Sequence, residues 1–257
     1  MAYQPVADNL RESFRIVAES RSGEVRELPG VSVASANTTF QMFNAAFLSE
    51  PAAGEAELTQ RILLPAMHFR TRGLDWAYWV CEDLIDTPTQ RRARRVFEKH
   101  GMRFSVELPG MVAKQVTPPV RGLPRLNIRR VEDDGTRAAF CSIGAVCFHV
   151  PIAWFTEVFD STNVWQRFES YVGYVDGEPV STAAVVFGGG VLGVYNVATV
   201  PGHQRRGYAE SVMRHALDEA RARHGECAVI LQSTPAGWKL YQRMGFRQVT
   251  RIAVYAS

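Results

Sequence analysis

The chain has 257 residues, of which 46% are hydrophobic and 21% are charged, and its formal net charge is +3. This composition is that of an ordinary globular protein and argues against a disordered, collagen-like or disulfide-rich chain. The length allows one large core or two cores of roughly 100 to 150 residues each. The small net charge gives little support for nucleic-acid binding, because the densest basic run, at residues 90–95, fits a solvated helix face.

The cysteines are widely spaced and form no CxxC pair, and no histidine stands near them at the spacing of zinc ligands. We therefore expect reduced thiols and no metal. No apolar run approaches the roughly 18 to 20 residues that span a bilayer, and the N-terminus has no charged leader followed by an apolar stretch. These features predict a cytoplasmic protein without a membrane partner. The four cysteines are Cys81, Cys141, Cys147 and Cys227.

The first half of the chain, residues 1–115, contains a strand, a helix start and a helix end in close succession. Residues 76–81 are typical of a strand, Thr87-Pro88 of a helix start, and His100-Gly101-Met102 of a helix end. The next ten residues, 116–125, contain Pro and Gly at intervals that interrupt any periodic pattern. We interpret them as a linker to a second domain at residues 126–257.

The second half is typical of a mixed α/β sheet rather than a strictly alternating one. A strand at 126–130 is followed by helices at 134–148 and 151–160. Three strands come next, and the turn Asp176-Gly177 joins the first two of them. The remaining elements are a helix with a strong apolar stripe, a strand, a helix that starts at Thr234-Pro235 and ends at Gly245, and a last strand. From the three strands onward the predicted ranges are 170–175, 180–187, 191–200, 208–223, 227–232, 234–245 and 246–255.

The turn between the apolar strand at 191–200 and the helix that follows has the properties of an anion site. A helix N-terminus presents unsatisfied backbone N–H groups, and Gly207 has no side chain to keep a phosphate oxygen away from them. Ala209 is small for the same reason, and Arg205 and Arg206 add positive charge. A glycine needed only for packing explains the turn equally well. The spacing is neither that of the dinucleotide fingerprint nor that of a P-loop.

Two motifs together give the second half a family resemblance. The turn resembles the pyrophosphate loop Q/R-x-x-G-x-G/A of the GNAT superfamily of acyl-CoA N-acyltransferases, with matches at Gln204, Gly207 and Ala209. Downstream, the segment 238–246 resembles the family's helix and Gly-Phe turn, with Tyr241 in the place of the family's tyrosine. The resemblance covers residues 126–257. It implies a mixed, mostly antiparallel sheet with a parallel, splayed central pair.

The first half resembles a degenerate GNAT module, as in tandem members of the superfamily. Its helix-and-stop pattern aligns with that of the second half and places Phe97, which has no hydroxyl, at the tyrosine position. The basic run at 90–95 also resembles the pyrophosphate loop. However, an alignment on the loop and the alignment on the helix and its stop exclude each other. An unrelated α/β domain is the alternative. Two GNAT-like modules in one chain can pair as a built-in pseudo-dimer, so the expected state is a monomer or a homodimer.

The resemblance implies acetyl-CoA as a co-substrate and no metal. Tyr241 is the candidate general acid that protonates the leaving thiolate, since an unperturbed phenol has a pKa near 10, comparable to that of the thiolate. The pantetheine arm would pair with the strand before the loop, and the loop would hold the pyrophosphate. The candidate CoA-binding residues are Asn196, Val197, Ala198, Thr199, Val200, Gln204, Arg205, Arg206, Gly207, Tyr208, Ala209 and Ser233.

The general base and the acceptor are less defined. The central strand has no Asp or Glu, and Glu157, Asp160 and Glu169 are each as readily explained as surface charges. The aromatic residues between 140 and 171 form either a lid over an apolar acceptor or core packing. We expect transfer of an acetyl group to the primary amine of a small molecule or amino acid by direct attack on the thioester. The alternatives are a peptide or protein amine as the acceptor, or a catalytically silent acyl-CoA-binding regulatory module.

Overall fold

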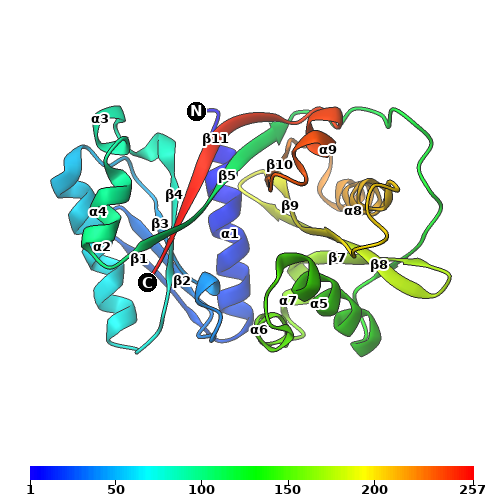
Figure 1. The fold of residues 1–257 in the computed structure, drawn as a ribbon, viewed down its shortest axis with the longest axis horizontal. Coiled ribbons are helices and arrows are strands. Elements are labelled where there is room, and N and C mark those ends of the chain that lie inside the picture. The colour runs from blue at the N-terminus through cyan, green and yellow to red at the C-terminus, as the bar shows by residue number, and fades with distance from the viewer. The chain divides into compact units, whose positions relative to one another are not determined.

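The computed structural model describes residues 1–257, which fold into two compact units (Figure 1). The first unit consists of Met1–Gly110 and Gln248–Ser257, and the second of Met111–Arg247. This division differs from the predicted domains, which assigned the last strand to the second half. The last strand, β11 (Arg247–Ala256), pairs antiparallel with β4 (Ala77–Cys81), for example at Ile252 and Cys81, and this pairing attaches it to the first unit.

The first unit is built on the strand order β1-β2-β3-β4-β11-β5. Strands β3 and β4 are parallel, whereas the pairs β1–β2, β2–β3 and β4–β11 are antiparallel. The predicted helix start at Thr87 is confirmed, because Asp86 accepts a hydrogen bond from the Thr89 N–H and caps the helix. The other elements are α1 (Gln4–Ser20), β1 (Glu24–Leu28), β2 (Val31–Ser35), η1 (Gln41–Phe43), β3 (Asn44–Leu48), α2 (Gly54–Arg70), η2 (Glu82–Leu84), α3 (Thr87–Gln90), α4 (Ala93–Lys99) and β5 (Arg103–Ala113).

The second unit has the strand order β10-β9-β8-β7-β6. Its β9–β10 pair is parallel and the other pairs are antiparallel, which confirms the mixed α/β class with one parallel central pair. The elements are β6 (Asn127–Arg130), α5 (Asp134–Phe148), α6 (Ile152–Val158), α7 (Val164–Arg167), β7 (Glu169–Val175), β8 (Glu178–Gly188), β9 (Val191–Thr199), α8 (Tyr208–His224), β10 (Val229–Gln232) and α9 (Trp238–Arg243).

Local chemistry explains the two long helices of this unit. Helix α5 begins with a reciprocal cap, in which Asp133 accepts from the Thr136 N–H while the Thr136 side chain binds the Asp133 backbone. The apolar stripe of α8 packs onto the sheet and forms the centre of the core, as its periodicity predicts. The buried residues of that stripe are Val212, Met213, Ala216, Leu217 and Ala220.

Two short helices differ from the predictions. Helix α9 begins at Trp238 rather than at Thr234, because Thr234 starts a turn in which its carbonyl accepts from the Gly237 and Trp238 N–H groups. Helix α7, at Val164–Arg167, was not predicted, since a single turn is too short to show periodicity. None of the helices combines the length and the apolarity that a membrane span requires.

The predicted linker is irregular in backbone but is fixed onto the second unit. Residues 114–126 contain neither helix nor strand. The Thr117 N–H donates to the Met244 carbonyl at 3.0 Å, and Arg214 Nη2 donates to the Thr117 carbonyl at 2.8 Å. Further along, Ser211 Oγ donates to the Pro124 carbonyl at 3.3 Å. The linker is therefore anchored to α8 at Arg214 and at Ser211.

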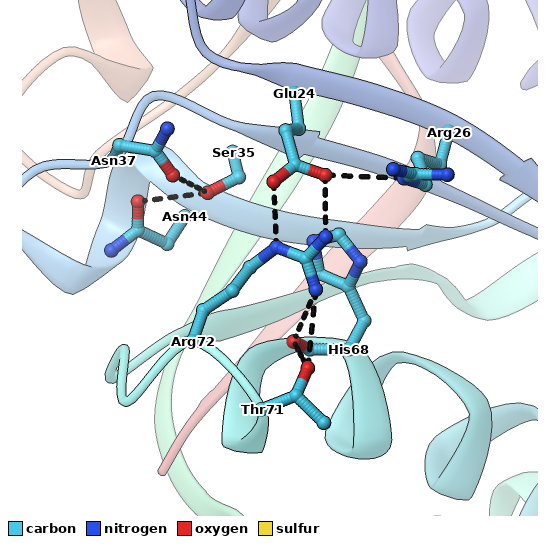
Figure 2. A network of polar contacts seen from close by, with 8 residues as sticks. All are labelled: Glu24, Arg26, Ser35, Asn37, Asn44, His68, Thr71 and Arg72. Atoms are coloured by element: carbon cyan, nitrogen blue, oxygen red, sulfur yellow. Dashed lines mark hydrogen bonds and ion pairs between the residues drawn. The ribbon is translucent and has the colours of Figure 1, made fainter.

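A network of charges holds β1 to the end of α2 in the first unit (Figure 2). Glu24 accepts from Arg72 through both carboxylate oxygens, at 2.6 and 2.7 Å, and from Arg26 at 3.1 Å. The hydrogen bonds from Arg72 are the main cause that lowers the pKa of Glu24 to about 2. The carboxylate is about one third exposed, at 31%, so solvent screens part of this interaction.

We expect Glu24→Gln to lower the free energy of unfolding at pH 7 by about 1 kcal/mol. The folded-state pKa lies below the unfolded one, so the wild-type advantage is complete above about pH 4.5 and is lost as pH falls towards 2. Urea unfolding of both proteins between pH 7 and pH 2 measures this difference. A difference in stability that does not change with pH would contradict the assignment of the pKa shift to Arg72.

Candidate functional site

The pairing of the parallel strands β9 and β10 in the second unit ends before β9 does. Their pairing ends at Val194 and Leu231, whereas β9 continues to Thr199. Beyond this point β10 no longer pairs with the backbone of β9, so this edge of β9 has no strand partner. An extended chain with amide groups, such as pantetheine, is the kind of ligand that can pair with such an exposed strand edge.

A bulge at Asn196 accompanies this separation. The register of β9 against β8 shifts between Thr182 and Ala184, and Asn196 has a left-handed backbone with φ of 50°. Asparagine tolerates this conformation better than most residues, and a bulge bends its strand and increases its twist. Two hydroxyls of β8 fix the bulge: Thr182 Oγ1 donates to the Asn196 carbonyl at 2.8 Å, and Ser181 Oγ to the Ala198 carbonyl at 2.7 Å.

The loop that follows β9 presents a run of free backbone donors. The N–H groups of residues 204–210 make no hydrogen bond within the protein, and the first internal bond of α8 runs from the Ser211 N–H to the Gly207 carbonyl. Gly207 caps the helix with φ of 89°, which is accessible to glycine at little energetic cost. The Gln204 side chain donates to the Thr199 carbonyl at 3.1 Å and ties the loop to the end of β9. These donors form an open anion site at the N-terminus of α8.

The charges around this loop are positive and are not neutralised by the chain. Arg205 and Arg206 are exposed and belong to none of the ion pairs of the structure. The nearest acidic residue in the chain, Glu210, is paired with Arg214 at 2.8 Å, and both of their side chains are mostly covered. The ring of Tyr208 lies 6.1 Å from that of His203, within the same loop region. The site therefore favours a ligand with at least two negative charges.

The end of β10 lies next to the last paired residues of β9. Ser233, a predicted contact residue, is fully buried, and its Oγ donates to the Thr234 carbonyl at 2.8 Å, so its hydroxyl is occupied within the turn. The preceding residue, Gln232, was missed by the sequence analysis. Its Nε2 is buried without an acceptor, directly after the last paired residue of β10. The sequence signal was a polar residue at the end of an otherwise apolar strand.

Tyr241 lies on α9 with its side chain almost fully buried in the core of the second unit. Its ring packs edge-on against Phe246, with centroids 5.9 Å apart, and lies so close to Gly237 that a Cβ there would be 2.5 Å from the ring. The hydroxyl makes no hydrogen bond within the protein. Burial raises the pKa of Tyr241 to about 12, above the value of 10 assumed from the sequence. The phenol therefore stays protonated, as a proton donor must.

The structure removes one of the three carboxylates considered as a general base. Glu169 is buried at the start of β7, where its carboxylate accepts from Arg223 and pairs with His224 Nε2 at 2.9 Å. His224 is the last residue of α8, whose 17 residues place it about 25 Å from the loop at the other end of the helix. Glu169 is thus a structural anchor of α8. No carboxylate lies on β9, as the sequence showed.

The aromatic residues between 140 and 171 mainly form core. Phe140 and Trp165 pack edge-on at 5.3 Å, and Phe168 lies 6.1 Å from Tyr195 on β9, which connects this cluster to the site strand. Only two members reach the surface, Phe148 and Trp154, with exposed fractions of 38% and 39%. The lid interpretation therefore applies at most to these two. The buried members are Phe140, Phe155, Phe159, Trp165, Phe168 and Tyr171.

The first unit contains a counterpart of this site that its own residues close. Strand β3, helix α2 and strand β4 repeat the parallel strand-helix-strand order of β9, α8 and β10. Here the Ala53 N–H donates to Glu57 Oε2 at 2.8 Å and the Gly54 N–H to Asp86 Oδ2 at 2.7 Å. A parallel bridge between Ala52 and Ile85 joins the chain beyond the two strands. The carboxylates of the first unit thus accept hydrogen bonds from backbone N–H groups whose counterparts in the second unit remain free.

Two further differences separate the units. The basic run at 90–95 lies at the junction of α3 and α4, and not between a strand and a helix, so its likeness to the loop was only a likeness of sequence. Phe97, at the tyrosine position, is fully buried and stacks on Tyr255 with centroids 4.0 Å apart. The counterpart of the loop, around residues 49–54, was not found from the sequence, because Pro51 stands three residues before Gly54, where the motif has a glutamine or an arginine.

A separated parallel pair, a bulge, an open helix N-terminus and a buried tyrosine on the next helix define an acyl-CoA N-acyltransferase type of site. Comparison with known proteins agrees: the pattern of the Acetyltransferase (GNAT) family matches residues 133–246. Residues 133–246 thus form a domain of this acetyltransferase family, which uses acetyl-CoA. A comparison with proteins of curated function finds no match.

Solved structures share the fold over both units. A GCN5-related N-acetyltransferase from Kribbella flavida is 17% identical and has a TM-score of 0.72, over 98% of this chain and 95% of that one. A functionally unknown protein from Staphylococcus epidermidis is 13% identical with a TM-score of 0.64, over 90% and 92% of the two chains. A GCN5-related N-acetyltransferase from Sphaerobacter thermophilus is 15% identical with a TM-score of 0.59, over 89% and 76%. At these identities the likeness concerns the fold alone.

Proposed function

We propose that the second unit transfers the acetyl group of acetyl-CoA to the primary amine of a small molecule or amino acid. The observation that carries this proposal is the juxtaposition of the open β9 edge with the free N–H groups of residues 204–210. A strand edge suits the amides of pantetheine, and a helix N-terminus with two unpaired arginines suits a diphosphate. One molecule, CoA, carries both features.

In this mechanism the chain positions the thioester and supplies one proton. The backbone of residues 196–200 pairs with the pantetheine arm, and the loop with Arg205 and Arg206 holds the diphosphate. The neutral amine attacks the carbonyl carbon, and the carbon–sulfur bond breaks as the amide bond forms. Tyr241 donates its proton to the departing thiolate, and the proton that the amine nitrogen loses restores the phenol through solvent. A neutral amine needs no base on β9, which agrees with the lack of a carboxylate there.

The closed counterpart in the first unit supports a stoichiometry of one CoA per chain. Its helix N-terminus is satisfied by Glu57 and Asp86, and the backbone hydrogen bonds from Ala53 and Gly54 are the first causes that lower the pKa values of these two carboxyls. Both therefore remain negatively charged near neutral pH and repel a phosphate. Calorimetric titration of the protein with acetyl-CoA measures the stoichiometry, and a value of two would contradict this part of the proposal.

The test of the activity is a CoA-release assay with acetyl-CoA over a panel of amines, amino acids and peptides. Release above hydrolysis with one of the small amines, together with the acetylated product by mass spectrometry, supports the proposal. Release with peptides alone would replace the small acceptor by a peptide or protein amine. Tight binding of acetyl-CoA without release across the whole panel would favour a silent acyl-CoA-binding module.

A further inference from the structure

The linker between the units ends directly against the loop. If Gly207 carried a Cβ, that atom would lie 3.0 Å from Pro124 Cδ. The hydrogen bond from Ser211 Oγ to the Pro124 carbonyl fixes the same point to the first turn of α8. The linker is also fixed at its start, where Thr117 binds Arg214 and Met244. The segment between these anchors thus begins beside Arg214 and ends beside the loop at Gly207.

This segment carries positive charge that nothing in the chain neutralises. Arg121 and Arg125 are exposed, and neither belongs to an ion pair of the structure. Residues 114–126 contain no Asp or Glu. Arg125 directly follows Pro124 and is therefore next in the chain to the residue that contacts Gly207. Together with Arg205 and Arg206 in the loop, the region holds four unpaired guanidinium groups.

Four cations exceed what a diphosphate needs, and CoA has a second anionic group. Its diphosphate and its ribose 3′-phosphate are separated by the ribose, so they require two separate sets of donors. The loop amides with Arg205 and Arg206 suit the first. The linker arginines, on the neighbouring segment, suit the second, because a planar guanidinium donates to phosphate in a bidentate manner.

We infer that Arg125, assisted by Arg121, binds the ribose 3′-phosphate and makes the enzyme select CoA over dephospho-CoA. This inference rests on the proposed use of acetyl-CoA. The two anchors of the linker contribute to it, since a segment held in place loses less entropy when its side chains bind a ligand. The linker, whose sequence shows only residues that interrupt regular structure, would then be part of the acetyl-CoA site.

The experiment is a calorimetric titration of the wild type and of variants with CoA and with dephospho-CoA. We expect the wild type to bind CoA about tenfold more tightly, which corresponds to one charge-assisted contact. Arg125→Ala should weaken CoA to the level of dephospho-CoA and leave dephospho-CoA unchanged. Arg206→Ala should weaken both ligands to a similar degree. Arg129→Ala is the matched control, because Arg129 is an exposed neighbour that is occupied by stacking at 4.7 Å over the Tyr174 ring.

The outcomes separate this inference from the function on which it rests. Equal binding of the two ligands by the wild type, or a preference for CoA that persists in Arg125→Ala and in the double variant with Arg121→Ala, would overturn the role of the linker while leaving CoA as the donor. Failure of the wild type to bind either ligand would instead overturn the proposed function. Thermal melts of each variant verify that it is folded.

Discussion

Tyr241→Phe should reduce the turnover of acetyl transfer by about tenfold or more and leave the affinity for acetyl-CoA nearly unchanged. The substitution removes a hydroxyl that makes no hydrogen bond within the protein, and it keeps the ring that packs against Phe246 and Gly237. The core therefore loses little, whereas the leaving thiolate loses its proton donor. Steady-state kinetics with the amine found in the CoA-release assay, together with a binding titration, measure the two quantities separately.

Tyr255→Phe supplies the matched control, because Tyr255 is also buried and burial also raises its pKa to about 12, but it lies in the first unit. This variant should keep full turnover. The pH profile adds a second readout. A general acid with a pKa of about 12 stays protonated, so turnover should not fall between pH 8 and pH 10. Equal turnover of Tyr241→Phe and wild type would remove Tyr241 from the mechanism.

Much of the second unit follows from local patterns in the sequence. The apolar run at 191–200 became a central strand because both of its faces are covered, and the stripe from Val212 to Ala220 became the buried face of α8. The loop could be located because the position of Gly207 requires a left-handed backbone and no side chain. Both requirements select glycine, which is visible in the sequence. Short-range chemistry of this kind is readable without a structure.

The features that local patterns do not encode were the ones that the sequence analysis missed. The attachment of β11 to β4 depends on pairing between residues about 170 positions apart, such as Ile252 with Cys81. In the first unit the helix N-terminus is occupied because the Gly54 N–H donates to Asp86, and the separation of these two residues along the chain does not reveal this contact. Likewise Glu169 could be excluded as a base only when its partners on α8 were known. Each of these depends on tertiary contacts between distant side chains or strands.

Gly207→Val should weaken the binding of acetyl-CoA by about 100-fold, the equivalent of losing about two charge-assisted hydrogen bonds. Its φ of 89° lies in the left-handed region, which disfavours a β-branched residue, so the loop must change its backbone to accept valine. A Cβ in the present backbone would also lie 3.0 Å from Pro124 Cδ. Both effects move the N–H groups of residues 204–210 out of alignment with the diphosphate.

Gly225→Val is the control for this variant. Gly225 caps the other end of the same helix with φ of 80° and ψ of 180°, a region that is almost exclusive to glycine, and no atom lies within 4 Å of its added Cβ. Valine there carries at least as much backbone strain as at Gly207, without the clash and about 25 Å from the loop. We expect both variants to lose thermal stability, and a loss of affinity only in Gly207→Val. An equal loss of affinity in both would mean that α8 transmits strain along its length. Unchanged affinity in Gly207→Val would show that the diphosphate binds elsewhere, and the assignment of the loop would then be wrong.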